Sequence, residues 1–160
     1  MYAARAWSVR HARGLNAFYA GFEALLLRMH GLFLALGYER IETPVAGIEK
    51  AVKGLLFDCR MCGQCVLSST GMSCPMNCPK SLRNGPCGGV RDNGNCEVKP
   101  DMKCVWVEAY RGSERIPGGV EAMTKIQFAV DQRLQGRSSW LKVVREKTAT
   151  PTAAAKGAPP

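Results

Sequence analysis

Apolar residues recur every three or four positions over two stretches in the first third of the chain. In residues 14–37 the recurring positions are Leu15, Phe18, Phe22, Leu25, Leu26, Met29, Leu32, Phe33 and Leu36. This spacing predicts one helix with a broad apolar face, and Gly37 is placed to end it. In residues 44–57 the positions are Val45, Ile48, Val52, Leu55 and Leu56, which predict a second helix. Two helices therefore precede the middle of the chain and give it a surface to pack on.

Helical spacing returns after residue 103. The stretch 103–111 (KCVWVEAYR) predicts a helical turn or two, which the glycines of residues 112–119 then break. A further helix is expected over 120–134, with apolar positions Met123, Ile126, Phe128, Val130 and Leu134, and a short one over 139–146. The tail, residues 148–160, consists of Ala, Thr, Pro and Gly with one Lys, which is typical of a disordered segment.

The middle of the chain, residues 58–104, shows no sustained period. It is dense in Gly, Asn, Pro, Ser and Cys, so it can hardly build an apolar core of its own. It also holds all eight cysteines of the chain: Cys59, Cys62, Cys65, Cys74, Cys78, Cys87, Cys96 and Cys104. We therefore expect a small, mostly α fold with few strands. An irregular Cys-rich metal-binding centre (58–104) would be packed between a helical segment at 1–57 and another at 105–147.

Length and charge narrow the function. A chain of 160 residues is the size of one ordinary domain and has no room for a typical (β/α)8 barrel. Chemistry that needs such a barrel must belong to a partner, so we expect no catalysis by this chain alone. The net charge of +9 is spread along the whole chain instead of being gathered into one stripe. A nucleic-acid groove is therefore not favoured, and an acidic protein partner is compatible with the charge.

The compartment decides how clustered thiols are interpreted. The amino terminus lacks a good signal peptide because Arg28 and His30 interrupt the apolar run 24–36. No uninterrupted apolar stretch approaches the roughly 20 residues that a membrane span needs. Residues 1–13 are rich in Arg and free of acidic residues, as in an organelle transit peptide, which stays as an alternative. We expect a cytoplasmic protein, and in the cytoplasm eight clustered thiols indicate metal ligands.

The opening run CRMCGQC, residues 59–65, is the most informative part of the cysteine pattern. Three thiolates two residues apart can hold three corners of a [4Fe–4S] cluster, and bacterial ferredoxins use this run together with a Cys-Pro. Here Cys78-Pro79 supplies a Cys-Pro, although it lies much farther along than in those ferredoxins. The pattern favours one or two iron-sulfur clusters.

Zinc is the main alternative, because tetrahedral four-thiolate sites are built from pairs such as Cys62-x2-Cys65. His11 and His30 lie outside the cysteine window, so mixed Cys and His sites are not favoured. Eight cysteines make two four-ligand sites, or one site and four thiols with other roles. Disulfides or free structural thiols are a third alternative. The sequence does not say how the cysteines divide.

Residues between the cysteines have two interpretations. Gly63 and the run NGPCGG at 84–89 predict turns with positive φ, which would point backbone N–H groups at sulfur and tune a reduction potential. They can also be tight loops and nothing more. Lys80, Arg83 and Arg91 would steady an anionic cluster, or they are solvated loop charges.

The string CRMCGQCVLSSTGMSCPMNCPKSLRNGPCGG, residues 59–89, resembles the methylenetetrahydrofolate reductase C-terminal family. The resemblance continues through Cys96, Cys104 and Val105-Trp106 and covers roughly residues 45–145. It implies a small protein or domain that accompanies the flavin-containing barrel enzyme of one-carbon metabolism. In acetogens, members act as the small subunit of a two-subunit reductase.

The resemblance implies a partner function in folate chemistry. The large subunit would reduce methylenetetrahydrofolate on its flavin, and this chain would dock beside it as an accessory iron-sulfur subunit for electron transfer. A zinc-stabilised docking subunit without a redox role is the alternative, and a nucleic-acid-binding zinc protein is a weaker one. No segment of this chain matches the barrel, so no flavin or folate ligands are expected in it.

Overall fold

The computed structural model describes residues 2–149, and helices dominate them. The helices are α1 (Tyr2–Arg10), α2 (Ala12–Arg28), α3 (His30–Leu36), α4 (Tyr38–Phe57), α5 (Val105–Ser113), α6 (Gly119–Thr124) and α7 (Ser139–Thr148), with 3-10 turns η1 (Leu67–Ser69), η2 (Pro75–Asn77) and η3 (Gln132–Leu134). In this part of the chain two isolated bridges, Val90 to Cys96 and Asn95 to Lys103, are the only β pairing. The small, mostly helical fold class is confirmed.

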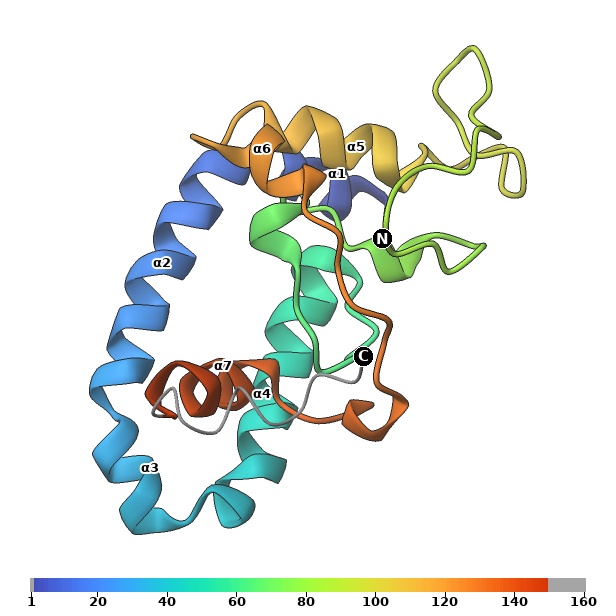
Figure 1. Ribbon diagram of the computed structural model, residues 1–160. Helices are drawn as coiled ribbons and strands as arrows, with labels where there is room; N and C mark the ends of the chain where they lie inside the picture. The colour runs from blue at the N-terminus through green and yellow to red at the C-terminus, as the bar shows by residue number, and fades with distance from the viewer. Residues whose placement is uncertain (1, 150–160) are drawn as a thin grey trace, which may run out of the picture.

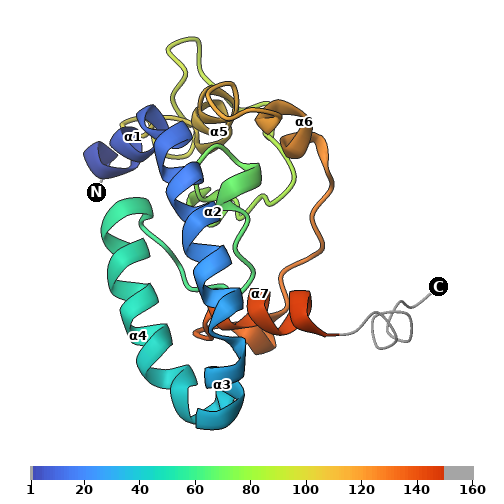
Figure 2. The same ribbon diagram turned by 90° about the vertical axis from the view of Figure 1, so that its left-hand side faces the viewer.

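The two longest helices, α2 and α4, run in opposite directions, and α7 crosses them at the end nearest α3 (Figures 1 and 2). An apolar cluster joins these helices: Leu26, Phe33, Trp140, Leu141 and Val144. At the other end α1 packs on α4 and α5, and a second cluster forms there: Ala12, Phe57, Leu67, Met72 and Ile116. The cysteine region lies between the two groups of helices, and the loop of residues 84–104 projects to one side (Figure 1).

The amino-terminal helices differ in their limits from the prediction. The single helix expected over 14–37 is divided at Met29 into α2 and α3, while Gly37, at a φ of 82°, ends α3 as expected. The helix α1 was not predicted. The helix α4 begins at Tyr38, well before the expected start at Pro44. Proline lacks the N–H that an interior helical bond needs, but Tyr38 and other residues of this first part pack against the α7 cluster, which offsets that loss.

The prediction of a helix over 120–134 was wrong beyond Thr124, where α6 ends. The next residues are held by side chains of the cysteine region. Asn84 bonds both backbone groups of Gln127, at 2.8 Å each, and Arg83 donates to the carbonyl of Phe128. These bonds take the place of helical ones. Phe128 is 90% exposed, so the apolar spacing that suggested a helix did not mark a buried face.

The remaining helix predictions agree with the structure. The helix expected near 103–111 is α5, although it continues through Gly112 to Ser113. The helix expected over 139–146 is α7, which ends at Thr148. The tail predicted to be disordered lies, from residue 150 onward, outside the described residues.

Among the described residues, no helix by itself has the length and apolar composition to cross a membrane. The pair α2 and α3 passes that test together but is bent by 53° at the break.

The helix α5 reaches the cysteine region through a contact between two glycines. Gly71 has a φ of 55°, and its carbonyl lies against Gly112, where an added Cβ would stand 1.9 Å from the Gly71 oxygen. Only a residue without a side chain permits this approach of two backbones.

We expect Gly112→Ala to lower the free energy of unfolding by about 3 kcal/mol, because backbone cannot yield to the added methyl group. Gly47→Ala is the matched control in α4, where a Cβ meets nothing within 4 Å. It should raise stability by about 0.5–1 kcal/mol through helix propensity. Urea unfolding followed by circular dichroism measures both, and equal effects of the two substitutions would contradict the packing argument.

Candidate metal centre

Four of the eight cysteines line one pocket at the end of α4. Asp58 and Met61 adopt left-handed conformations, with φ of 53° and 49°, and turn the chain across the helix end. The cysteines of this pocket are Cys59, Cys62, Cys65 and Cys74. All eight cysteines are free thiols. The structure thus brings the CRMCGQC run together with the next cysteine along the chain.

Backbone contacts from the segment before α7 fix this loop. The N–H of Gly136 donates to the Met61 carbonyl at 2.8 Å, and the N–H of Asp131 donates to the Gln64 side chain at 2.8 Å. Gly63, at a φ of 70°, lies so close to this segment that a Cβ would stand 2.4 Å from the Leu134 carbonyl oxygen. The expected turn at Gly63 is present, and its function here is close packing.

The thiols of the pocket are close enough to affect each other's ionisation. Burial raises the pKa of Cys74 to about 12, and the negative charge of Cys59 adds to the effect. The pKa of Cys59 is also raised, by burial first, although the Met61 N–H donates to its sulfur at 3.3 Å and opposes the shift. Four thiolates without a cation would repel one another, so a bound metal would supply the charge that stabilises them.

The structure brings a different Cys-Pro to this pocket from the one that the ferredoxin comparison suggested. Cys78-Pro79 does not line the pocket, whereas Cys74-Pro75, at the start of η2, does. Cys78 packs instead against the cluster of Cys96, Met102 and Val105. The Cys-Pro dipeptide occurs twice in this sequence, and only the tertiary structure distinguishes the two.

The other four cysteines, Cys78, Cys87, Cys96 and Cys104, lie around the loop that projects to one side. Cys96 and Cys104 are buried, and the backbone pairs Cys96 with Val90 across an isolated bridge. Cys87 is exposed, and its sulfur accepts the N–H of Gly89 at 3.4 Å. The expected N–H to sulfur contact within NGPCGG is therefore confirmed.

The basic residues between the cysteines have separate contacts. Lys80 pairs with Glu97 on the surface, and Arg91 donates to the Glu97 carbonyl. Arg83 lines the pocket, where it donates to the Gln64 carbonyl at 2.9 Å as well as to Phe128. Its bonds join two backbone segments beside the pocket.

The donors at this pocket are four thiolates, a set that can hold zinc or an iron-sulfur cluster. Within residues 2–149, no three His, Cys, Asp or Glu side chains converge on a point that one metal ion could occupy. A cluster takes one thiolate on each iron and so holds its ligands farther apart than one zinc does. The pocket that the four cysteines line has a volume of about 20 Å³, which is room for about one water molecule.

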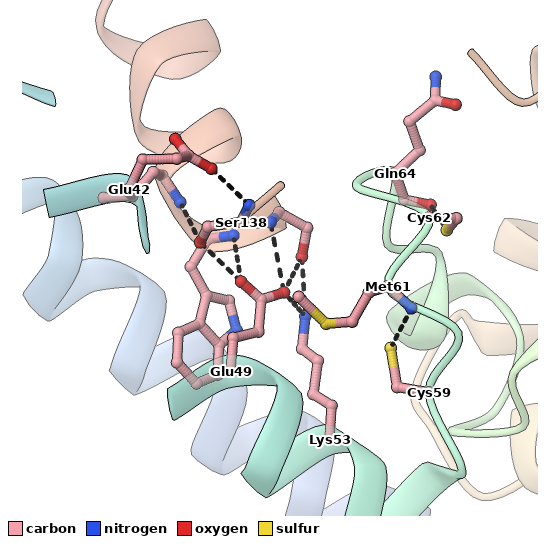
Figure 3. A network of polar contacts seen from close by, with 11 residues as sticks. Glu42, Glu49, Lys53, Cys59, Met61, Cys62, Gln64 and Ser138 are labelled. Atoms are coloured by element: carbon pink, nitrogen blue, oxygen red, sulfur yellow. Dashed lines mark hydrogen bonds and ion pairs between the residues drawn. The ribbon is translucent and has the colours of Figure 1, made fainter. Parts of the chain in front are cut away.

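Sequence reasoning missed two charged residues that line the same pocket, Glu49 and Lys53 of α4. Both are almost completely buried, with 2% and 4% of the side chain exposed, and their side chains are 2.7 Å apart (Figure 3). A signal was present, because Glu49 and Lys53 continue the apolar face of the helix from Val45 at steps of four. Polar residues at core positions are rare unless paired.

The amino-terminal end of α7 completes this network. The Glu49 carboxylate accepts bonds from the hydroxyls of Ser138 and Ser139 and from the N–H groups of Ser139 and Trp140. The Ser139 hydroxyl also accepts from Lys53 at 2.8 Å. A carboxylate is favoured at the start of a helix, where N–H groups are unpaired. Glu49 therefore binds α7 to α4.

Lys53 is held as a cation in this network. Burial alone would lower its pKa, but the negative charges of Cys65 and Glu49 outweigh burial and raise the pKa above its ordinary value. Its ammonium also lies 5.3 Å from the centre of the Trp140 ring. A positive charge is thus fixed at the wall of the four-cysteine pocket.

The family called methylene-tetrahydrofolate reductase C terminal matches residues 38–133, which is more than half of the chain and includes all eight cysteines. The chain belongs to this family. The match confirms the resemblance drawn from residues 59–89. It includes Glu49 and Lys53 but ends before Ser138 and α7. A search of curated proteins found no match, and a search of solved structures found none either.

This member of the methylene-tetrahydrofolate reductase C-terminal family also has a large apolar groove. It has a volume of about 540 Å³ and lies between α2 and α4, with Trp140 and Phe33 among the residues that line it. Large apolar side chains at its rim are exposed: Phe18, Leu25, Ile48 and Val52. Cys65 and Lys53 line both this groove and the cysteine pocket, so the two are adjacent.

We expect Glu49→Ala to lower the free energy of unfolding by about 3–5 kcal/mol, because Lys53 would remain buried without its counter-charge. Glu39→Ala is the control on the same helix. Glu39 is 78% exposed and pairs with Arg137 and Arg145 at the surface, so its loss should cost less than about 1 kcal/mol. Urea unfolding at neutral pH compares the two, and a cost for Glu49→Ala no larger than that of the control would disprove the role of Glu49 in binding α7 to α4.

Proposed function

We propose that this chain is an accessory electron-relay subunit or domain of a flavin-containing methylenetetrahydrofolate reductase. Its relay is a [4Fe–4S] cluster on Cys59, Cys62, Cys65 and Cys74. The observation that carries the proposal is the gathering of the CRMCGQC cysteines and Cys74-Pro75 around one pocket. This set combines three thiolates two residues apart with a Cys-Pro, the donor pattern of ferredoxin clusters. The family match supplies the link to the reductase.

The chemistry assigns different steps to the two proteins. Conversion of a methylene group on folate to a methyl group takes up two electrons and two protons, and flavin on the large subunit would perform it. An iron-sulfur cluster passes one electron at a time, so two transfers from a one-electron donor protein would serve each turnover. The residues of this chain bind the cluster, exclude water from it and hold it near the partner. The chain is not catalytic by itself.

Cys78, Cys87, Cys96 and Cys104 form a second candidate metal site. Cys87, Cys96 and Cys104 lie on backbone segments that pair with one another. Val90, three residues after Cys87, forms a bridge with Cys96, and the Cys104 N–H donates to the Gly94 carbonyl. We propose a second cluster there, with zinc as the alternative occupant. Eight unpaired thiols are also in keeping with a cytoplasmic protein, the compartment we propose.

We propose that the reductase docks on the apolar groove between α2 and α4. Exposed apolar side chains gather along this groove, and patches of this kind mark protein interaction sites. The groove shares Cys65 with the four-cysteine pocket. A partner bound there would stand beside the cluster, as electron transfer to its flavin requires.

Metal analysis of the anaerobically purified protein tests the relay. We expect iron with matching sulfide and a visible absorption band that dithionite bleaches. Cys62→Ser should lower the iron content by the amount that one cluster holds. Adding Cys74→Ser to Cys62→Ser should lower the iron content no further. Adding Cys96→Ser to Cys62→Ser should lower it clearly more. This pattern follows because ligands of one cluster fail together, whereas different sites fail separately. Zinc with a featureless spectrum would leave a structural docking subunit, and an equal loss from all three variants would refute the division into two sets.

Phe18→Asp should weaken binding to the reductase by about tenfold or more, because it places a charge in an apolar contact. Phe128→Asp is the matched control, since Phe128 is 90% exposed and does not line the groove. Titration calorimetry with the purified large subunit of the same organism measures both affinities. Unchanged affinity for Phe18→Asp, or an equal loss for the control, would place the docking site elsewhere.

A further inference from the structure

The buried pair of α4 is oriented with its positive member nearer the cysteines. Glu49 lies one helical turn before Lys53, and the carbonyl of Lys53 accepts the N–H of Cys59 at 3.3 Å. Figure 3 shows the two side chains rising together from α4, with Met61 reaching toward Lys53 from the cysteine loop. The pair therefore has its positive end toward the loop that begins at Cys59.

The Glu49 carboxylate is stabilised by several hydrogen-bond donors besides Lys53. Two serine hydroxyls and two N–H groups at the start of α7 donate to its carboxylate. Lys53, in contrast, has only one carboxylate within ion-pair distance among the described residues, together with the Ser139 hydroxyl and the Trp140 ring. The donors of α7 hold the Glu49 carboxylate toward that helix, and the Lys53 ammonium is the charged end of the pair on the side of the cysteine loop (Figure 3).

We propose that Lys53, held by Glu49 and the start of α7, raises the reduction potential of the cluster bound by Cys59, Cys62, Cys65 and Cys74. This inference rests on the proposed function. One-electron reduction makes a thiolate-bound cluster more negative by one unit, with no bond made or broken in the chain. A fixed positive charge in a poorly solvated wall favours the reduced state over the oxidised state. Lys53 acts as a positioning residue through its charge and does not ligate iron.

If Lys53 and Glu49 only pack the core, their substitutions should affect the reduction potential differently than if their charges set that potential. Lys53→Met removes the positive charge, so the potential should fall. Glu49→Gln keeps one carbonyl oxygen that can accept part of the α7 hydrogen bonds but removes the negative charge, so the potential should rise. If the two residues had only a structural role, the reduction potentials of the Lys53→Met and Glu49→Gln variants would move in the same direction or stay unchanged.

The experiment uses the full chain, purified anaerobically, with iron and sulfide measured for each variant. Midpoint potentials come from a dye-mediated titration with dithionite, followed by electron paramagnetic resonance of the reduced cluster. For Lys53→Met we expect the ratio of reduced to oxidised cluster at a fixed potential to fall at least tenfold, which is about 59 mV for a one-electron couple. Glu49→Gln should shift the potential upward. Lys50→Met removes the same charge from the exposed side of α4 and should leave the potential unchanged.

Lys53→Met leaves Glu49 buried without a counter-ion and can fail to fold. The double variant Lys53→Met with Glu49→Gln removes both charges, and its potential should still lie below that of the parent chain. A parent chain without iron and sulfide would overturn the proposed function and this inference with it. A parent chain with its cluster, and with potentials that Lys53→Met, the double variant and Glu49→Gln leave unchanged, would overturn the inference alone.

Discussion

The carboxylate of Glu49 connects the parts of this structure that matter for its chemistry. It is buried on α4, pairs with Lys53 and accepts the backbone and side-chain donors at the start of α7. A buried carboxylate without these partners would be very costly, so α7 has one well-defined place against α4. That placement also brings the segment before α7 onto the cysteine loop, where Gly136 bonds Met61. One charged group thus determines the position of a helix, a cation and the pocket wall.

The cysteine region depends on its surroundings because it has little apolar core of its own. Its buried side chains are shared with the helices around it: Leu67 and Met72 pack with Phe57 of α4, and Cys104 packs with Trp106 of α5. Close backbone contacts at Gly63 and Gly71 add to this packing. Metal bonds would add the free energy that the loop lacks, which couples metal binding to folding. The two functions that we propose for the region, holding metal and presenting it to a partner, would therefore depend on the same helices.

The four-cysteine pocket has charged side chains in its wall and adjoins an apolar groove. The ion pair of α4 and Arg83 line the pocket, and Lys53 and Cys65 also line the groove between α2 and α4. The electron relay that we propose would need both features, since polar groups tune its potential and a dry, close contact shortens the distance to the acceptor. The proposed relay is compatible with membership in the methylene-tetrahydrofolate reductase C-terminal family.

The sequence by itself determined the helical class, most of the helix positions, the eight candidate ligands and the family. These follow from local information: apolar spacing marks helices, and the CRMCGQC run and the CPMNCPK string need no knowledge of distant contacts. Only the tertiary structure decided that Cys74-Pro75 lines the pocket and Cys78-Pro79 does not, that residues 125–131 are not helical, and that Glu49 and Lys53 are buried beside the thiols. Each of these depends on groups far apart in the chain, such as Asn84 with Gln127 or Glu49 with Ser138. Local patterns cannot encode such pairs, because their free energy arises only when folding removes water from both partners.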